Sequence, residues 1–178
     1  TNNWTGMRRA QAFLRREHVS LVLGLGGYAS LPAASAAIRC GLPLVLLEFK
    51  NPNDVNATLE NAYKQIQTYK AEIPSLFRYN AFCIIGDGIH ARAGTISSEW
   101  GRFMPWKSTD GVHIVEPGRP DQETLLRGML NKQTLLDLVR HFILFEETRE
   151  KTIKKIAQYH QYYAVNKAIN TTITAVSP

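Results

Sequence analysis

Cysteine and long apolar runs are scarce in this chain. Its 178 residues include two cysteines, Cys40 and Cys83. Two thiols are too few for the disulfide framework of a small secreted domain, and too few to form a zinc site unaided, so the sequence predicts a reducing compartment, the cytoplasm. No apolar run approaches the ~20 residues that a helix needs to span a bilayer, and no signal peptide follows Met7. We therefore expect no membrane partner.

Acidic residues are scarce in the first part of the chain. Residues 1–47 contain five arginines but a single acid, Glu17, and the first aspartate of the chain is Asp54. The net charge of +6 favours a polyanionic partner, although much of the excess arises in this stretch. The shortage of carboxylates restricts where a metal site can form, because hard cations such as Mg²⁺ bind oxygen ligands.

Several motifs of common enzyme classes are also absent. The sequence has no Gly-x-x-x-x-Gly-Lys-Ser/Thr loop for a triphosphate and no Gly-x-Ser-x-Gly turn for a serine nucleophile, and Gly24-Leu-Gly-Gly27 is too short for a dinucleotide fingerprint. No two histidines have the spacing His-x-x-x-His of a metal site. These absences argue against a P-loop nucleotide site, a serine hydrolase and a histidine-based zinc enzyme.

The apolar patterns that are present predict an α/β fold. Three short runs are typical of buried strands: residues 19–25, 42–50 and 80–86. Asp87-Gly88 is a hairpin turn signal, and the alternation over residues 89–96 predicts the returning strand. The 44% apolar content fits one globular domain, or a domain with a short extension.

Helical patterns lie between the second and third strands and throughout the last third of the chain. Asn53 or Asp54 can cap a helix that runs to about Glu72. Three further helices are predicted over residues 121–130, 132–145 and 152–169. The change from mixed to helical patterning predicts an α/β domain over residues 1–118 and a helical segment over residues 119–178.

Glu48-Phe49-Lys50 is the strongest local signal for chemistry. Side chains alternate along a strand, so Glu48 and Lys50 lie on the same face at its end. A carboxylate there can bind a divalent cation, and a lysine beside it can orient water or steady charge on a phosphate, as in metal-dependent phosphodiester cleavage. An ordinary salt bridge at a strand end gives the same pattern.

The next predicted helix brings two polar side chains to one face. Gln65 and Tyr69 are four residues apart, so they are neighbours on the helix surface. Both can donate hydrogen bonds to a phosphate or to a catalytic carboxylate. An amphipathic helix with Tyr69 in the core is the alternative interpretation.

From Gly41 onward the sequence resembles the R (restriction, motor) subunit of type I restriction enzymes. The stretches that carry the resemblance occur in family order over roughly the last three quarters of the chain. They are Gly-Leu-Pro-Leu-Val-Leu-Leu-Glu-Phe-Lys-Asn-Pro (41–52), Gln-Ile-Gln-Thr-Tyr-Lys-Ala-Glu-Ile-Pro-Ser-Leu-Phe-Arg-Tyr-Asn (65–80), Asp-Gly-Ile-His-Ala-Arg-Ala-Gly-Thr-Ile (87–96), Leu-Leu-Asp-Leu-Val-Arg-His-Phe-Ile-Leu-Phe-Glu (135–146) and Lys-Lys-Ile-Ala-Gln-Tyr-His-Gln-Tyr-Tyr-Ala-Val-Asn (154–166).

The resemblance implies a restriction-endonuclease-like (PD-(D/E)xK) core followed by helices that lead into an ATP-driven motor. It implies that Glu48 and Lys50 are catalytic, that Glu48 binds Mg²⁺, and that Gln65 and Tyr69 form a supporting motif near the DNA. It also implies that Gln161 lies at the entrance to the motor, where it contacts adenine. ATP would serve only the full-length parent protein, because the sequence ends before the family's Walker A loop.

The resemblance further implies partners and a reaction. The partners are double-stranded DNA and the methyltransferase and specificity subunits of a restriction complex, and the reaction is Mg²⁺-dependent double-strand DNA cleavage. Two other readings stay open: a catalytically inactive fragment of the same ancestry, and a DNA-binding or subunit-docking module that does not cut.

Residues 1–40 depart from the family pattern. The family's second metal-binding aspartate falls on Ala34, and no aspartate lies upstream of Glu48. A frameshift in the gene segment for residues 5–40 is one hypothesis for this departure. Loss of the aspartate predicts weak metal binding, because a lone carboxylate holds Mg²⁺ poorly.

Overall fold

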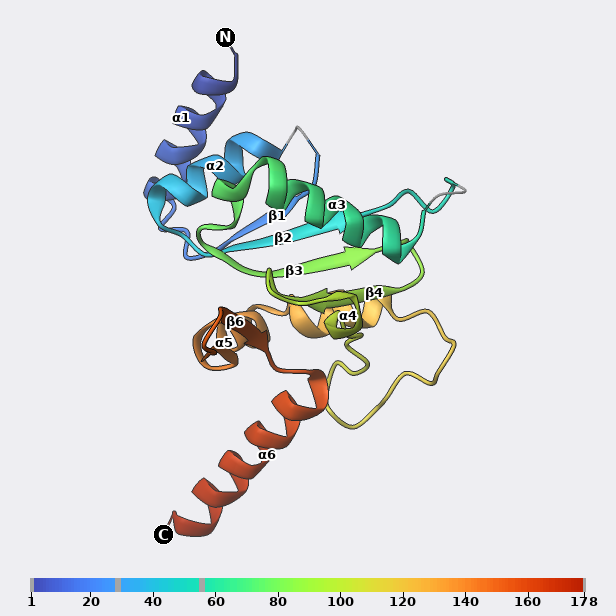
Figure 1. Ribbon diagram of the computed structural model, residues 1–178. Helices are drawn as coiled ribbons and strands as arrows, with labels where there is room; N and C mark the ends of the chain where they lie inside the picture. The colour runs from blue at the N-terminus through green and yellow to red at the C-terminus, as the bar shows by residue number, and fades with distance from the viewer. Residues whose placement is uncertain (1, 28–29, 55–56, 178) are drawn as a thin grey trace.

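The computed structural model describes residues 2–27, 30–54 and 57–177 (Figure 1). Within these ranges no helix combines the length and the apolar character that crossing a membrane requires. The chain forms a mixed α/β structure with a four-stranded sheet between two layers of helices and a two-stranded hairpin near its C-terminal end.

The four strands lie in the order β1-β2-β3-β4. They are β1 (Val22–Leu25), β2 (Leu44–Phe49), β3 (Asn80–Gly86) and β4 (Ala91–Gly94). The first three strands are parallel and β4 is antiparallel to β3. Parallel neighbours need a crossover, which is supplied by α2 (Leu31–Cys40) and then by α3 (Leu59–Glu72). The predicted strands and the hairpin at Asp87-Gly88 are confirmed.

Two apolar clusters cover the two faces of the sheet. On one face, side chains of β2 and β3 pack against α1 (Asn2–Arg16), α2 and α3, and on the other they pack against α4 (Gln122–Met129) and α5 (Lys132–His141) (Figure 1). Alternate residues of β2 divide between the clusters. Leu44 and Leu46 belong to the first, and Val45 and Leu47 to the second. Complete burial of one such side chain contributes about 1.5–3 kcal/mol.

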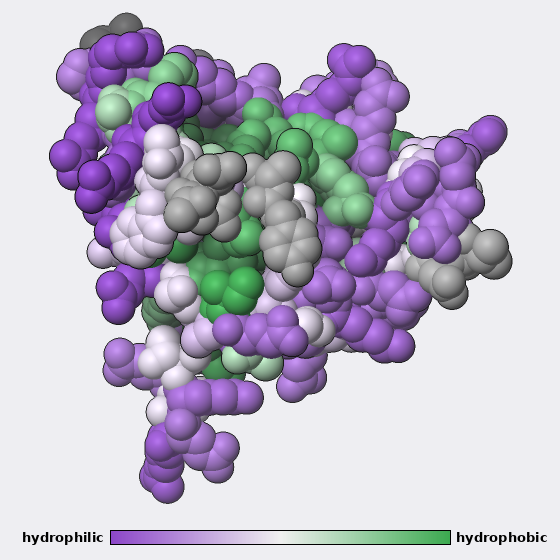
Figure 2. Space-filling view, turned by 90° about the horizontal axis from the view of Figure 1, so that it is seen from above, coloured by the Kyte–Doolittle hydropathy of each residue, from purple (hydrophilic) through white to green (hydrophobic). Residues whose placement is uncertain are grey.

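The helix α1 carries four of the five arginines that precede β2. Met7 and Leu14, two turns apart, are its buried apolar residues. Its four arginines are exposed: Arg8, Arg9, Arg15 and Arg16. Figure 2, which views the layer of α1–α3 from above, shows apolar side chains in the middle of this face and hydrophilic ones around its rim.

The helix α3 begins later than its sequence predicts. Its N-cap is Thr58, whose side chain accepts a hydrogen bond from the Asn61 amide at 3.1 Å. The prediction of a cap at Asn53 or Asp54 is therefore wrong. The Asn51 side chain accepts from the Asn53 amide at 3.0 Å, an Asx turn that continues the turn chemistry after β2 and delays the helix.

The C-terminal segment contains a β-hairpin where the sequence predicted helices. Residues 132–145 and 152–169 are not continuous helices. The helix α5 ends at His141, and β5 (Ile143–Glu147) pairs antiparallel with β6 (Thr152–Ile156) before α6 (Tyr159–Val176). The apolar residues in these two ranges have a mixed spacing that fits a helix as well as a strand. Thr and Ile, which favour strands, were the signal for β5 and β6.

The predicted boundary near residue 118 does not coincide with a break in the core. The helices α4 and α5 lie beyond it, yet Leu125 and Leu138 are fully buried in the cluster that covers Val45 and Leu47. Assignment of residues 119–178 to a separate segment stays a prediction, and the structure places α4 and α5 with the sheet.

Candidate active site

Glu48 and Lys50 lie together at the C-terminal end of β2. Glu48 is the last but one residue of the strand and is 7% exposed, and Lys50 follows the strand directly. The Lys50 Nζ atom lies 3.1 Å from Glu48 Oε1. The pleat of the strand sends both side chains to the same face. The expected proximity of the carboxylate and the ammonium group is confirmed.

Tyr69 reaches the same carboxylate from α3. Its hydroxyl donates to Glu48 Oε2 at 3.2 Å. Burial, followed by the negative charge of Glu48 and the hydrogen bond to it, raises the pKa of Tyr69 above its ordinary value. The Gln65 side chain, one helical turn earlier, has a smaller, opposite effect and lowers the pKa of Tyr69. The structure thus brings together all four residues that the sequence singled out here.

A glycine pair at the end of β1 completes the surroundings of Glu48. The Gly26 amide donates to the Leu47 carbonyl at 2.6 Å. A Cβ atom built on Gly26 would lie 2.1 Å from Glu48 Oε2, so any side chain there would collide with the carboxylate. The backbone of Gly27 also acts on Tyr69 and lowers the pKa of its hydroxyl. The sequence reasoning missed both glycines, although a glycine pair directly after an apolar strand run was the signal.

The residues of this site do not fit Mg²⁺, which the family resemblance implies. Both oxygens of Glu48 already have partners, Lys50 and Tyr69. Among the residues that the structure describes, no group of three His, Cys, Asp or Glu side chains could hold a metal ion. Ala34, where the second carboxylate was expected, is 2% exposed within the apolar cluster between α2 and the sheet.

The site can nevertheless attract and position an anion. The Lys50 side chain is 24% exposed, so its ammonium group can approach a phosphate from solvent while it contacts Glu48. Glu48 is held from the other side by the Tyr69 hydroxyl. A fixed carboxylate beside a reachable cation is the part of a phosphodiester-cleaving site that does not depend on a second acid.

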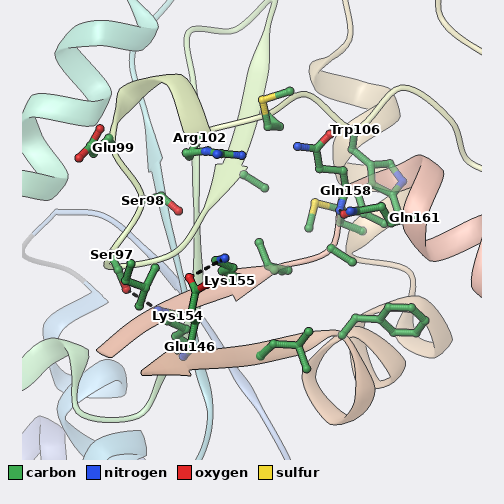
Figure 3. Close-up of a pocket in the computed structure, with 18 of the residues that line it drawn as sticks. Ser97, Ser98, Glu99, Arg102, Trp106, Glu146, Lys154, Lys155, Gln158 and Gln161 are labelled. Carbon is green, nitrogen blue, oxygen red and sulfur yellow. Dashed lines mark hydrogen bonds and ion pairs between the residues drawn. The ribbon is translucent and has the colours of Figure 1, made fainter. Parts of the chain in front are cut away.

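Gln161 lies elsewhere, at a cavity of about 770 Å³ between the hairpin, α5 and the start of α6 (Figure 3). Its side chain accepts a hydrogen bond from the Gln158 amide at 2.9 Å and so closes a capping box at the start of α6. Arg102 and the ion-paired Lys155 also line this cavity, and Glu48 and Lys50 do not. The structure therefore does not bring Gln161 into the cluster around Glu48.

Fold and site together define an α/β domain that presents Glu-x-Lys at the end of a buried parallel strand. Residues 36–102 match the family described as type I restriction enzyme R protein N terminus (HSDR_N). This chain carries an N-terminal fragment of a type I restriction enzyme R subunit.

Two relatives of this kind match most of the chain. It is 49% identical over 140 residues to the type I restriction enzyme HindI endonuclease subunit of Haemophilus influenzae. It is 31% identical over 152 residues to the putative MjaIXP endonuclease subunit of Methanocaldococcus jannaschii. The two matches cover 77% and 76% of this chain. The chain spans 13% and 14% of the length of these relatives.

A protein of another kind is similar to a smaller part of the chain. The UDP-N-acetylglucosamine–N-acetylmuramyl-(pentapeptide) pyrophosphoryl-undecaprenol N-acetylglucosamine transferase of Serratia proteamaculans is 47% identical over 45 residues, which are 25% of this chain and 13% of that protein. Transferases of the same name from Sodalis glossinidius and Photorhabdus laumondii match similar lengths.

Proposed function

We propose that this chain carries half of the DNA-cleavage site of a type I restriction enzyme, and that this half binds double-stranded DNA but does not cut it alone. The observation that carries the proposal is the cluster in which Lys50 and Tyr69 engage the two oxygens of Glu48. This cluster lies within the residues that match the R-protein family. The restriction-endonuclease-like core remains part of the same proposal.

Each residue has a separate role in the proposed site. Lys50 contacts a phosphate of the DNA backbone, because its ammonium group is partly exposed beside the carboxylate. Tyr69 and Gln65 position Glu48 through the phenol hydroxyl. In a complete site Mg²⁺ would supply Lewis-acid chemistry at the phosphate, and the residues described here do not suffice to hold it.

The proposed setting is a restriction complex with methyltransferase and specificity subunits. The family to which residues 36–102 belong supports this setting. ATP and a contact between Gln161 and adenine belong to the longer R protein in this proposal. The cavity beside Gln161 is large enough for a small ligand.

A DNA-binding and cleavage assay tests the proposal. The chain is titrated against linear duplex DNA at low salt, and incubated with supercoiled plasmid and Mg²⁺ or Mn²⁺. We expect salt-sensitive binding, a severalfold loss of affinity in Lys50→Ala, and uncut plasmid. Lys64→Ala is the matched control, because it removes the same charge from an exposed position of α3.

Two outcomes would contradict the proposal. Plasmid cleavage that is lost in Lys50→Ala would mean that the site is complete in this chain. Equal affinity of the parent chain and Lys50→Ala for duplex DNA would remove the role given to the lysine.

A further inference from the structure

The strand β1 is covered on one face only. Leu23 and Leu25 are 44% and 57% exposed, although their register neighbours on β2, Val45 and Leu47, are fully buried or nearly so. Strands of a parallel sheet are normally buried on both faces and read as continuous apolar runs. The sequence of β1 fits such a strand, but its place in this molecule leaves one face open.

The layer that covers β2 does not extend to β1. The apolar cluster on that side draws its buried members from β2, β3, β4, the loop residue Trp106 and the helices that follow, and within the described ranges none comes from β1. The opposite face of β1 is well packed, because Val22 joins the cluster of α1 and α2. The first elements therefore fit one another better than they fit the layer contributed by α4 and α5.

Sequence similarity changes in kind near the same part of the chain. The stretches that resemble the R protein run from Gly41 onward, the matched family begins at residue 36, and the HindI match covers 77% of the chain. The transferase match spans 45 residues, close to the quarter that remains. The stretch before Gly41, which lacks the R-protein pattern, is about as long as the transferase match, and we assign that match mainly to it.

We infer that the chain joins two segments of different ancestry, a transferase-like segment and an R-protein segment, and that β2 is the seam between them. The inference deepens the proposed function and rests on it, because the seam passes through the site. Glu48 belongs to the R-protein segment. Its neighbour across the sheet, Gly26, belongs to the other segment and offers a backbone instead of a second carboxylate.

This ancestry also accounts for the departure from the family pattern over residues 1–40 without a frameshift. The residues form two regular helices with a buried apolar side, including Met7, Leu14, Ala34 and Ala37. A sequence translated in the wrong frame has no reason to follow the helical period so closely. The shortage of acidic residues before Glu48 then reflects a segment that never carried metal ligands.

A segment exchange tests the inference. Residues 1–40 are replaced by the residues that precede the equivalent of Gly41 in the HindI endonuclease subunit, and Mn²⁺ binding is measured by calorimetry. We expect the exchanged chain to bind Mn²⁺ roughly tenfold more tightly than the parent chain, or better, which corresponds to about 1.4 kcal/mol. The gain should disappear when Glu48→Gln is added to the exchanged chain.

The outcomes separate the inference from the proposed function. Equal Mn²⁺ affinity of parent and exchanged chains would overturn the two-segment inference. Tighter Mn²⁺ binding without DNA cleavage would support the inference and contradict the proposed cleavage site. Hydrogen exchange of the parent chain gives a measurement that does not depend on folding of the exchanged chain. The amides of α1 and α2 should exchange as one unit, at a lower opening free energy than the amides of β3. Equal opening free energies for the two helices and for β3 would contradict the inference.

Discussion

At the scale of single residues, the Tyr69 hydroxyl ties α3 to the end of β2. It donates to Glu48 Oε2 at 3.2 Å, while Lys50 holds the other oxygen. Glu48 is nearly buried, so each of these partners offsets part of the cost of removing its charge from water. The fixed position of the carboxylate depends on both.

Tyr69→Phe should destabilise the chain by about 1 kcal/mol, because it removes one hydrogen bond to a poorly solvated carboxylate and leaves the ring in place. Urea unfolding monitored by circular dichroism measures the change. Tyr79→Phe is the control, since Tyr79 is 43% exposed. Equal stability of the two variants would mean that the Tyr69 hydroxyl does not support Glu48.

Cys83 should make the fold sensitive to alkaline pH. Burial raises the pKa of its thiol from the ordinary value of 9.0 to about 12. Its folded pKa is the higher one, so the stabilisation is present below pH 9 and is lost as the pH rises toward 12. Cys83→Ala should flatten the fall in unfolding free energy above pH 9 by up to about 1.4 kcal/mol per pH unit. The partly exposed Cys40 provides the control. If Cys40→Ala flattened the pH dependence equally, the buried thiol of Cys83 would not be its cause.

The sequence could predict only those neighbours in the site that lie close together along the chain. Glu48 and Lys50 are two residues apart on a strand, and Gln65 and Tyr69 are one helical turn apart, so local geometry fixes each pair. Gly26 approaches Glu48 only because β1 pairs with β2 in one particular register. That pairing is a tertiary contact, and no local pattern specifies it.

At the scale of elements, one residue of β6 makes several hydrogen bonds that attach the β5–β6 hairpin to the sheet. The Lys154 amide donates to the Ser97 hydroxyl oxygen at 2.8 Å, its carbonyl accepts from Thr95 Oγ1 at 2.6 Å, and its Nζ atom donates to the Asn80 carbonyl. Burial lowers the pKa of Lys154 below its ordinary value. The sequence missed this hairpin because its docking contacts come from residues far away along the chain.

Lys154→Met should loosen the hairpin while its aliphatic length is kept. Loss of the buried hydrogen bond to Asn80 is expected to cost about 1–2 kcal/mol and to speed hydrogen exchange in β5 and β6. Lys155→Met is the matched control, since its ion pair with Glu146 is about half exposed and contributes about 0–1 kcal/mol. The docking role would be refuted by equal exchange rates in the two variants.

Leu25 of β1 and Leu47 of β2 are neighbours in the sheet, but truncation of each to alanine should change stability by different amounts. Leu25 is 57% exposed and Leu47, its partner, is 2% exposed. Leu25→Ala should change the unfolding free energy by less than about 0.5 kcal/mol, and Leu47→Ala should lower it by about 2–5 kcal/mol. Denaturant titration decides the point, because a large loss in Leu25→Ala would show that a further layer covers β1 in solution.

At the scale of the whole molecule, the sheet needs the helices beyond residue 118. Leu125, Leu135 and Leu138 cover Val45 and Leu47, so the α/β part of the chain shares its core with α4 and α5. The sequence indicated the α/β class correctly from three strand patterns. The predicted boundary near residue 118 rested on the change from mixed to helical apolar patterns. Such a pattern does not show how a helix packs on a strand that is distant in the sequence.

A chain that ends at residue 118 should therefore lose cooperative unfolding. Removal of α4 and α5 uncovers one face of β2 and β3, which exposes several side chains worth about 1.5–3 kcal/mol each. Thermal unfolding and dye binding compare the shortened chain with the full chain. A sharp transition at the same temperature would show that residues 1–118 form a domain by themselves.

The missing Cβ of Gly26 limits how this protein could regain a second acid. An aspartate at that position would be next to Glu48 in the sheet, but its first side-chain atom would overlap a carboxylate oxygen at 2.1 Å. An aspartate at Gly26 therefore requires the end of the Glu48 side chain to move away from its present partners, Lys50 and Tyr69. A second acid at this point of the backbone would be gained only by giving up the contacts that now hold the first.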